Sequence, residues 1–117
     1  MRHHRHRQTL GRIPDQRLAL VRSLVRELLV RGQIQTTVTR ARAASRVAEH
    51  IITLAKKGDL PAHRRAIKIL PDRKVLAPIF KDATQRFSDR QSGFTRVTRI
   101  GLRRGDAAET ALLELLS

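Results

Sequence analysis

Apolar residues recur at helical spacing through most of the chain. Leucine and valine return every three or four positions after Pro14, which predicts a first helix that ends at Gly32. A second helix is expected from Thr39, as its N-cap, to Lys57, with Gly58 as its stop. The apolar residues of this helix fall within about a third of the helical wheel, and basic residues dominate the opposite side. The pattern therefore predicts helices with one face in a core and one cationic face.

Two shorter helices are expected in the middle of the chain. The first covers residues 60–70 and has Asp59 as its cap. The second covers residues 71–87 and contains Pro78, which removes a backbone hydrogen bond from a helix interior. We therefore expect either a kink at this proline or a helix that starts only near Ala77.

Polar and apolar residues alternate in two places, and this alternation predicts strands. Residues 33–38 are rich in β-branched side chains, and residues 94–100 alternate over their whole length. Residues 110–116 are largely apolar and are expected to form a buried closing strand. Gly101 and Gly105 lie on either side of an arginine pair, so the last two strands should form a hairpin with basic residues at its tip.

The first dozen residues differ in composition from the rest of the chain. They carry four arginines and three histidines but no acidic residue. Such a segment cannot bury a core, and we expect it to be disordered alone and to fold along a nucleic acid. The remaining length suits one modest core. The expected organisation is a basic tail over residues 1–12 and a single domain over residues 13–117.

The charge of the whole chain points to a polyanionic partner. The 117 residues carry a formal charge of +15, and 20 of the 25 basic residues are arginines. Arginine binds phosphate through a planar fork, so the bias favours RNA, although a GC-rich genome would also raise the arginine count. There is no Trp or Tyr, and Phe80, Phe87 and Phe94 are expected in the core. We therefore expect binding by charge neutralisation and shape matching rather than by base stacking.

Several classes of function are disfavoured by what the chain lacks. It has no cysteine, so it can form neither a disulfide nor a thiolate metal site. No apolar run approaches the length of a membrane span, and the first residues do not resemble a signal peptide, so a cytosolic protein is expected. No paired-carboxylate, Ser-His-Asp, phosphate-loop or metal-ligand spacing appears, so we expect neither an enzyme nor a cofactor. The histidines, His3, His4 and His6 in the tail and His50 and His63 on helices, are interpreted as phosphate contacts and surface residues rather than metal ligands.

The candidate RNA-binding residues are basic side chains of the tail, of the polar helix faces and of the hairpin. A basic helix face is often only solvated surface, but here few acidic residues oppose the positive charge. The candidates are Arg2, His3, His4, Arg5, Arg7 and Arg12 in the tail; Arg17 and Arg22 in the first helix; Arg40, Arg42, Arg46, Lys56 and Lys57 in the second; Arg64 and Arg65 in the third; and Arg96, Arg99, Arg103 and Arg104 in the hairpin.

Five short motifs in order give the chain a family resemblance. They are M-R-H with L-G-R in the tail, I-Q-T-T at 34–37, I-T-L-A-K-K-G-D-L at 52–60, G-F-T-R at 93–96 and R-R-G-D-A-A at 103–108. With these motifs the chain resembles, over nearly its whole length, the bacterial large-subunit ribosomal protein number seventeen family. A DNA-binding regulator is the alternative, but its compact helix-turn-helix is not evident in a chain whose charge is spread over a tail, three helices and a hairpin.

The resemblance implies a fold and a place in the cell. The implied fold is a two-layer α+β structure in the order helix, strand, three helices, two strands, with a small mixed three-stranded sheet covered by helices and a basic N-terminal extension. The implied function is that of a structural constituent of the large ribosomal subunit in the bacterial cytoplasm, which supports translation. The implied partners are the large-subunit ribosomal RNA near the outer end of the peptide exit tunnel and neighbouring ribosomal proteins, including number thirty-two. Neither a small-molecule substrate nor a membrane is expected.

Overall fold

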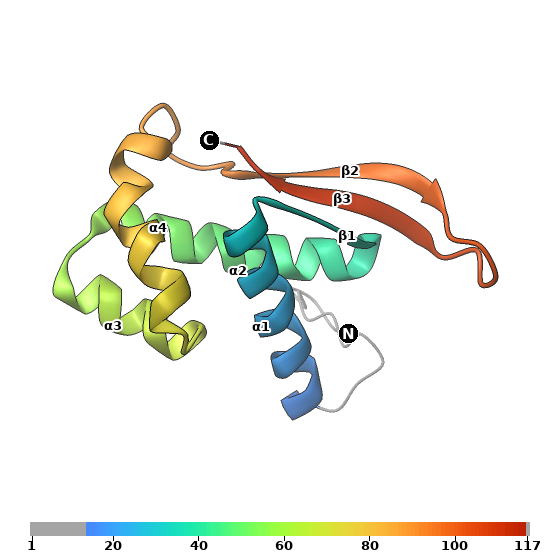
Figure 1. Cartoon of the computed structure of the whole chain (residues 1–117), viewed down its shortest axis with the longest axis horizontal. Coiled ribbons are helices and arrows are strands. Elements are labelled where there is room, and N and C mark those ends of the chain that lie inside the picture. The colour runs from blue at the N-terminus through green and yellow to red at the C-terminus, as the bar shows by residue number, and fades with distance from the viewer. Residues whose placement is uncertain (1–13, 117) are drawn as a thin grey trace, which may run out of the picture.

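The computed structural model describes residues 14–116 and forms an α+β fold in the expected order of elements (Figure 1). The elements are α1 (Pro14–Arg31), β1 (Gln33–Thr37), α2 (Val38–Lys57), α3 (Leu60–Ile69), α4 (Arg73–Arg86), β2 (Thr95–Leu102) and β3 (Glu109–Leu115). The tail over residues 1–12 lies outside the described residues. Within the described part, no helix has both the length and the apolar character that a bilayer span requires.

The three strands form a sheet in the order β1-β3-β2, and every hydrogen-bonded pair is antiparallel. The expectation of a mixed sheet is therefore wrong. The cause is that β3, which follows β2 through a short tip, takes the central position and runs opposite to both neighbours. The first and second strands run the same way, but β3 separates them. Leu113 marks the register, since it lies opposite both Ile34 and Val97.

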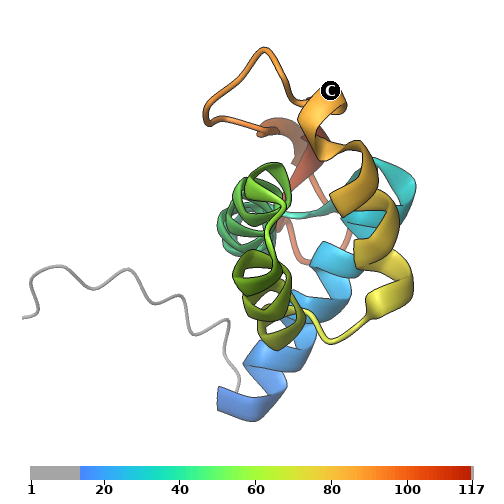
Figure 2. The ribbon, with the colours of Figure 1, turned by 90° about the vertical axis from the view of Figure 1, so that its left-hand side faces the viewer.

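One face of the sheet packs on α2, and the alternation of side chains along β3 follows from this contact. Ala111, Leu113 and Leu115 are buried, whereas the residues between them are only partly covered. Figure 1 shows α2 running beneath the sheet, and Figure 2, which looks along α2, shows the other helices around it. Helix α2 contacts all six other elements. The sheet and the helices thus form two layers around α2, while the β2-β3 hairpin extends past the N-terminal end of α2.

The core depends on the small and branched side chains of α2 and on two aromatic rings. Alanines at three consecutive turns of α2 are fully buried and let its neighbours approach closely. Phe87 and Phe94 are also buried and meet edge to face, with ring centroids 5.5 Å apart. Phe80 is only half-buried and packs against His63 at 4.9 Å. The expectation of a core position is thus confirmed for two of the three phenylalanines.

Helix α2 starts earlier than the sequence suggested. Its N-cap is Thr37 in extended conformation, and Thr39 lies in the first turn. The side chain of Thr37 makes no capping hydrogen bond, and burial of Val38 in the core anchors the first turn instead. A threonine near the start of the helix was therefore a weak guide to the boundary. The predicted stop is confirmed, since Gly58 adopts the left-handed conformation with φ of 70°.

Aspartates cap the two shorter helices. A side-chain oxygen of Asp59 accepts a hydrogen bond from the third residue after it, at 2.9 Å, and Asp72 does the same at 3.3 Å. The second cap starts α4 at Arg73, so the expected late start near Ala77 is wrong. The helix continues through Pro78 to Arg86.

Candidate nucleic-acid interface

Positive charge is distributed unevenly between the helical part and the hairpin. Residues 14–93 contain seventeen basic and seven acidic residues, a net charge of +10. Residues 94–116, which include both strands of the hairpin, contain four basic and three acidic residues, a net charge of +1. The electrostatic attraction for a polyanion therefore comes mainly from the helices, together with the arginines of the tail.

A basic stripe runs along the exposed face of α2. We define it by Arg42, Arg46, His50 and Lys57, which are all exposed and follow one another at one or two helical turns. Fifteen residues separate its ends, so the stripe is about 22 Å long. His50 was not among the predicted RNA-binding residues, although its spacing of four residues from Arg46 places both on one face of the helix.

Two other candidates of α2 lie away from the basic stripe. Arg40 is half-buried on the side of α2 that faces the core residues. Lys56 is also half-buried: its Nζ lies over the ring of Phe94, 5.3 Å from the centroid, and donates to the backbone carbonyl of Arg90. Lys56 therefore links the C-terminal end of α2 to Phe94 and to the segment around Arg90.

Further exposed cations occur on α3 and α4. Arg64 and Arg65 are exposed and make no ion pair or hydrogen bond within residues 14–116, and the same holds for Arg42 and Lys57 of the stripe. Three further exposed cations, in the first and third turns of α4, were not among the predicted RNA-binding residues. They are Arg73, Lys74 and Lys81.

Arg22 is engaged inside the protein. Its Nε donates to the carbonyl oxygen of Ile69 at 2.9 Å, and its Nη2 donates to that of Lys68 at 3.2 Å. These carbonyls belong to the last turn of α3, where backbone acceptors lack helical partners. Arg22 therefore links α1 to the C-terminal end of α3, a contact across almost fifty residues that no local pattern reveals. Arg17 is half-buried near the start of α1.

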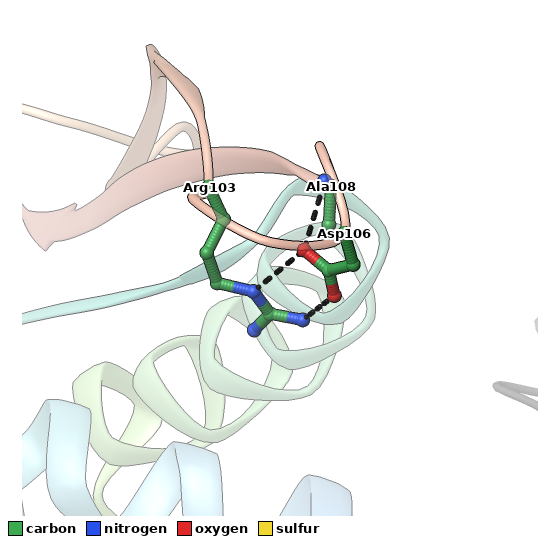
Figure 3. Close-up of polar contacts among 3 residues, drawn as sticks. All are labelled: Arg103, Asp106 and Ala108. Atoms are coloured by element: carbon green, nitrogen blue, oxygen red, sulfur yellow. Dashed lines mark hydrogen bonds and ion pairs between the residues drawn. The ribbon is translucent and has the colours of Figure 1, made fainter.

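Three of the four arginines in the hairpin have acidic partners within it. Arg96 pairs with Glu114 at 2.7 Å, and Arg99 pairs with Glu109 at 3.6 Å. At the tip, Arg103 forms a two-bond contact with Asp106 (Figure 3). Arg104 makes no such contact among the described residues. Phosphate would have to compete with a carboxylate at three of these four positions.

The geometry of the tip lowers the pKa of Asp106. Its carboxylate accepts from Nε of Arg103 at 3.1 Å and from the backbone N–H of Ala108 at 3.2 Å (Figure 3). The hydrogen bond from Arg103, followed by that from Ala108, lowers the pKa of Asp106 from 3.8 to about 2. The same pairing raises the pKa of Arg103. The left-handed backbone of Gly105, with φ of 98°, lets the chain turn between the two partners.

The hairpin tip should lose this contact only in strong acid. Because the pKa of Asp106 is lower in the folded chain than in an unfolded one, the contact stabilises the tip fully above about pH 4 and is lost as the pH falls through about 2. A carboxyl-carbon NMR titration should give a midpoint near 2 for the wild type and a clearly higher midpoint for Arg103→Gln. Equal midpoints in the two proteins would show that Arg103 does not set the pKa.

The tail candidates stay a prediction. Arg2, His3, His4, Arg5, Arg7 and Arg12 lie outside the described residues. The structure describes the surroundings of the other candidate side chains, but their contacts with RNA likewise stay predictions.

Comparison with known proteins places the chain in a family. The family model described as "Ribosomal protein L17" matches residues 20–116. The chain is 48% identical over 107 residues to "Large ribosomal subunit protein bL17" of Finegoldia magna, covering 92% of the chain and 82% of that protein. It is 45% identical to the protein of the same name from Clostridium tetani, covering 92% and 95% of the two chains. For that of Desulfosudis oleivorans the identity is 44%, over the whole chain and 56% of the relative. The family model and the bacterial relatives agree over nearly all of the described fold, and the chain belongs to the ribosomal protein L17 family.

Proposed function

We propose that this chain is a structural constituent of the large ribosomal subunit and binds large-subunit ribosomal RNA through its helical part and its tail. The observation that carries the proposal is the net charge of +10 on residues 14–93, displayed in part by exposed arginines without acidic partners in the described structure. The names of the bacterial relatives support the place in the large subunit.

The mechanism is electrostatic. Basic side chains along α2 and α3 displace counterions from packed phosphates, and the arginine forks fix the orientation of the backbone that they touch. A helix face anchored by buried alanines and isoleucines holds these forks at fixed spacing. Aromatic stacking on RNA bases has little part, because the rings of Phe87 and Phe94 are buried in the core.

The finer placement follows from the family resemblance. We place the chain near the outer end of the peptide exit tunnel in the cytoplasmic ribosome, with neighbouring ribosomal proteins that include number thirty-two. Residues 1–12 serve as an RNA-binding tail, and residues 13–117 act as one domain. The family is a structural one, so its members are not enzymes, and the proposed role needs neither a cofactor nor a small-molecule substrate.

Sedimentation tests the proposal directly. Ribosomes from the bacterium that encodes the chain are separated on sucrose gradients at low and high salt, and the chain is quantified against known large-subunit proteins. We expect one copy per large subunit, retained at moderately raised salt. Recovery with chromosomal DNA would instead support the regulator alternative, and recovery in the free soluble fraction would contradict both.

A further inference from the structure

The outer edge of β2 carries backbone groups that pair with no other strand of the described sheet. In an antiparallel pair, every second residue exchanges backbone hydrogen bonds with the neighbouring strand. The backbone N–H and C=O of the residues in between point away from that strand. The N–H of Leu116 donates to the carbonyl of Phe94 at 2.8 Å, which sets the register of this pair. The backbone N–H and C=O of Arg96 and Thr98 therefore face β3, whereas those of Val97 point outward, away from β3.

The hydrogen bonds of Thr95, the residue after Phe94, agree with this register. Its N–H points outward and donates to Oε1 of Glu49 at 2.8 Å, and its hydroxyl makes a second contact of 2.8 Å with the same atom. Ser45 on the preceding turn of α2 contacts the Thr95 hydroxyl at 2.7 Å. Helix α2 thus provides a hydrogen-bond acceptor for the outward N–H of Thr95. No described residue does so for the outward N–H groups of Val97 and Arg99.

Two exposed apolar side chains follow on the same edge strand. Ile100 is 53% exposed and Leu102 is 69% exposed. A register shift between Arg99 and Gly101 places one extra residue in β2 opposite β3, and residues of both strands line a hollow of about 230 Å³ there. Edge strands of soluble proteins are usually protected by charges or by a cover. An open edge with large apolar residues indicates a contact surface.

The charges of the hairpin favour a protein over RNA at this edge. The hairpin has a net charge of only +1, and Arg96, Arg99 and Arg103 pair with acidic residues of the hairpin itself. Phosphates cannot cover apolar side chains, but a protein segment can. A second copy of the chain is disfavoured because each copy carries a formal charge of +15.

We propose that the outer edge of β2, over residues 97–102, accepts an extended segment of a neighbouring large-subunit protein as a fourth strand. The backbone of that segment would pair with the outward groups of Val97 and Arg99, and its apolar side chains would cover Ile100 and Leu102. The inference rests on the proposed place of the chain in the large subunit.

Amide exchange tests the strand pairing. In the free chain, the amides of Val97 and Arg99 should exchange faster than those of Arg96 and Thr98, because only the latter bond to β3. In purified large subunits that contain the full chain, residue-resolved exchange at Val97 and Arg99 should slow by tenfold or more. Unchanged exchange in the subunit would overturn the inference and leave the proposed function intact. Absence of the chain from the subunits would overturn both.

A photo-crosslink identifies the class of partner. With Leu102 replaced by benzoylphenylalanine in the full chain, irradiated subunits should yield a product that ribonuclease leaves intact and that contains one other large-subunit protein. A crosslink to RNA or to a second copy of the chain, or no crosslink, would contradict the proposal.

A matched pair of variants then tests the edge itself. Arg99→Pro removes the outward N–H, and Arg99→Gln removes the charge but keeps the N–H. In the benzoylphenylalanine background, the proline variant should lower the crosslink yield at least fivefold, whereas the glutamine variant should stay within twofold of the parent. Thermal melts of the free proteins identify any loss of folding. Equal yields from two folded variants would refute strand pairing.

Discussion

Replacing Phe94 by alanine should lower the free energy of unfolding by about 3–5 kcal/mol. The side chain of Phe94 is fully buried, meets Phe87 edge to face at 5.5 Å and lies beneath Nζ of Lys56. Its removal leaves a cavity where the start of β2, the end of α4 and α2 meet. Urea unfolding followed by circular dichroism measures the change, with the wild type under the same conditions.

Phe80→Ala is the matched control for this prediction. It removes the same ring, but from a half-buried position on α4. The loss of unfolding free energy should be clearly smaller than that for Phe94, because less apolar surface returns to water. Equal losses of unfolding free energy would contradict the prediction, because they would show that the deeper burial of Phe94 adds nothing to stability.

Replacing Arg42, Arg64 and Arg65 together by glutamine should weaken RNA binding about a hundredfold. Each phosphate contact contributes about fourfold to fivefold near 0.15 M salt by the counterion rule, and loss of all three should lower the slope of log affinity against log salt by about 2–3. The melting temperature should hardly change, since these exposed side chains have no partners among the described residues. Filter binding to a large-subunit ribosomal RNA fragment at several salt concentrations measures both effects.

A second triple variant separates position from total charge. Arg96, Arg99 and Arg103 changed together to glutamine removes the same three charges from the hairpin, where each is already paired with a carboxylate. Affinity and salt slope should fall much less than in the helical variant. An equal fall in both would show that RNA contacts the hairpin as closely as the helices, in agreement with the broader candidate set from the sequence.

Local patterns predicted the helices well because their determinants are local. The apolar spacing of α2, its glycine stop and the Asp59 cap of α3 all operate within a few residues. The start of α2 was less well defined, since Thr36, Thr37 and Thr39 lie close together and tertiary burial of Val38 decides between them. Alternation predicted β1 and β2, and a largely apolar run predicted β3, each to within one or two residues at either end.

Contacts between distant residues were beyond the sequence alone. The position of β3 between the other strands depends on pairing across the whole fold. In the sequence, Arg22 is one of several basic residues on a polar helix face. Only the folded structure brings it beside the last carbonyl groups of α3. The ion pairs of the hairpin likewise depend on strand register, so the sequence predicted four arginines for RNA where three already have acidic partners.

The central position of β3 also determines when the sheet can form. Gln33 pairs with Glu114, 81 residues later, and within residues 14–116 β2 pairs only with β3. During synthesis, β1 and β2 therefore remain without any strand partner until the ribosome has added β3, and the closure of so long a loop slows folding. Helices α1 to α4 precede that moment and can fold first. A nascent chain that stops short of β3 therefore cannot form the described sheet, because β3 is the strand with which both β1 and β2 pair.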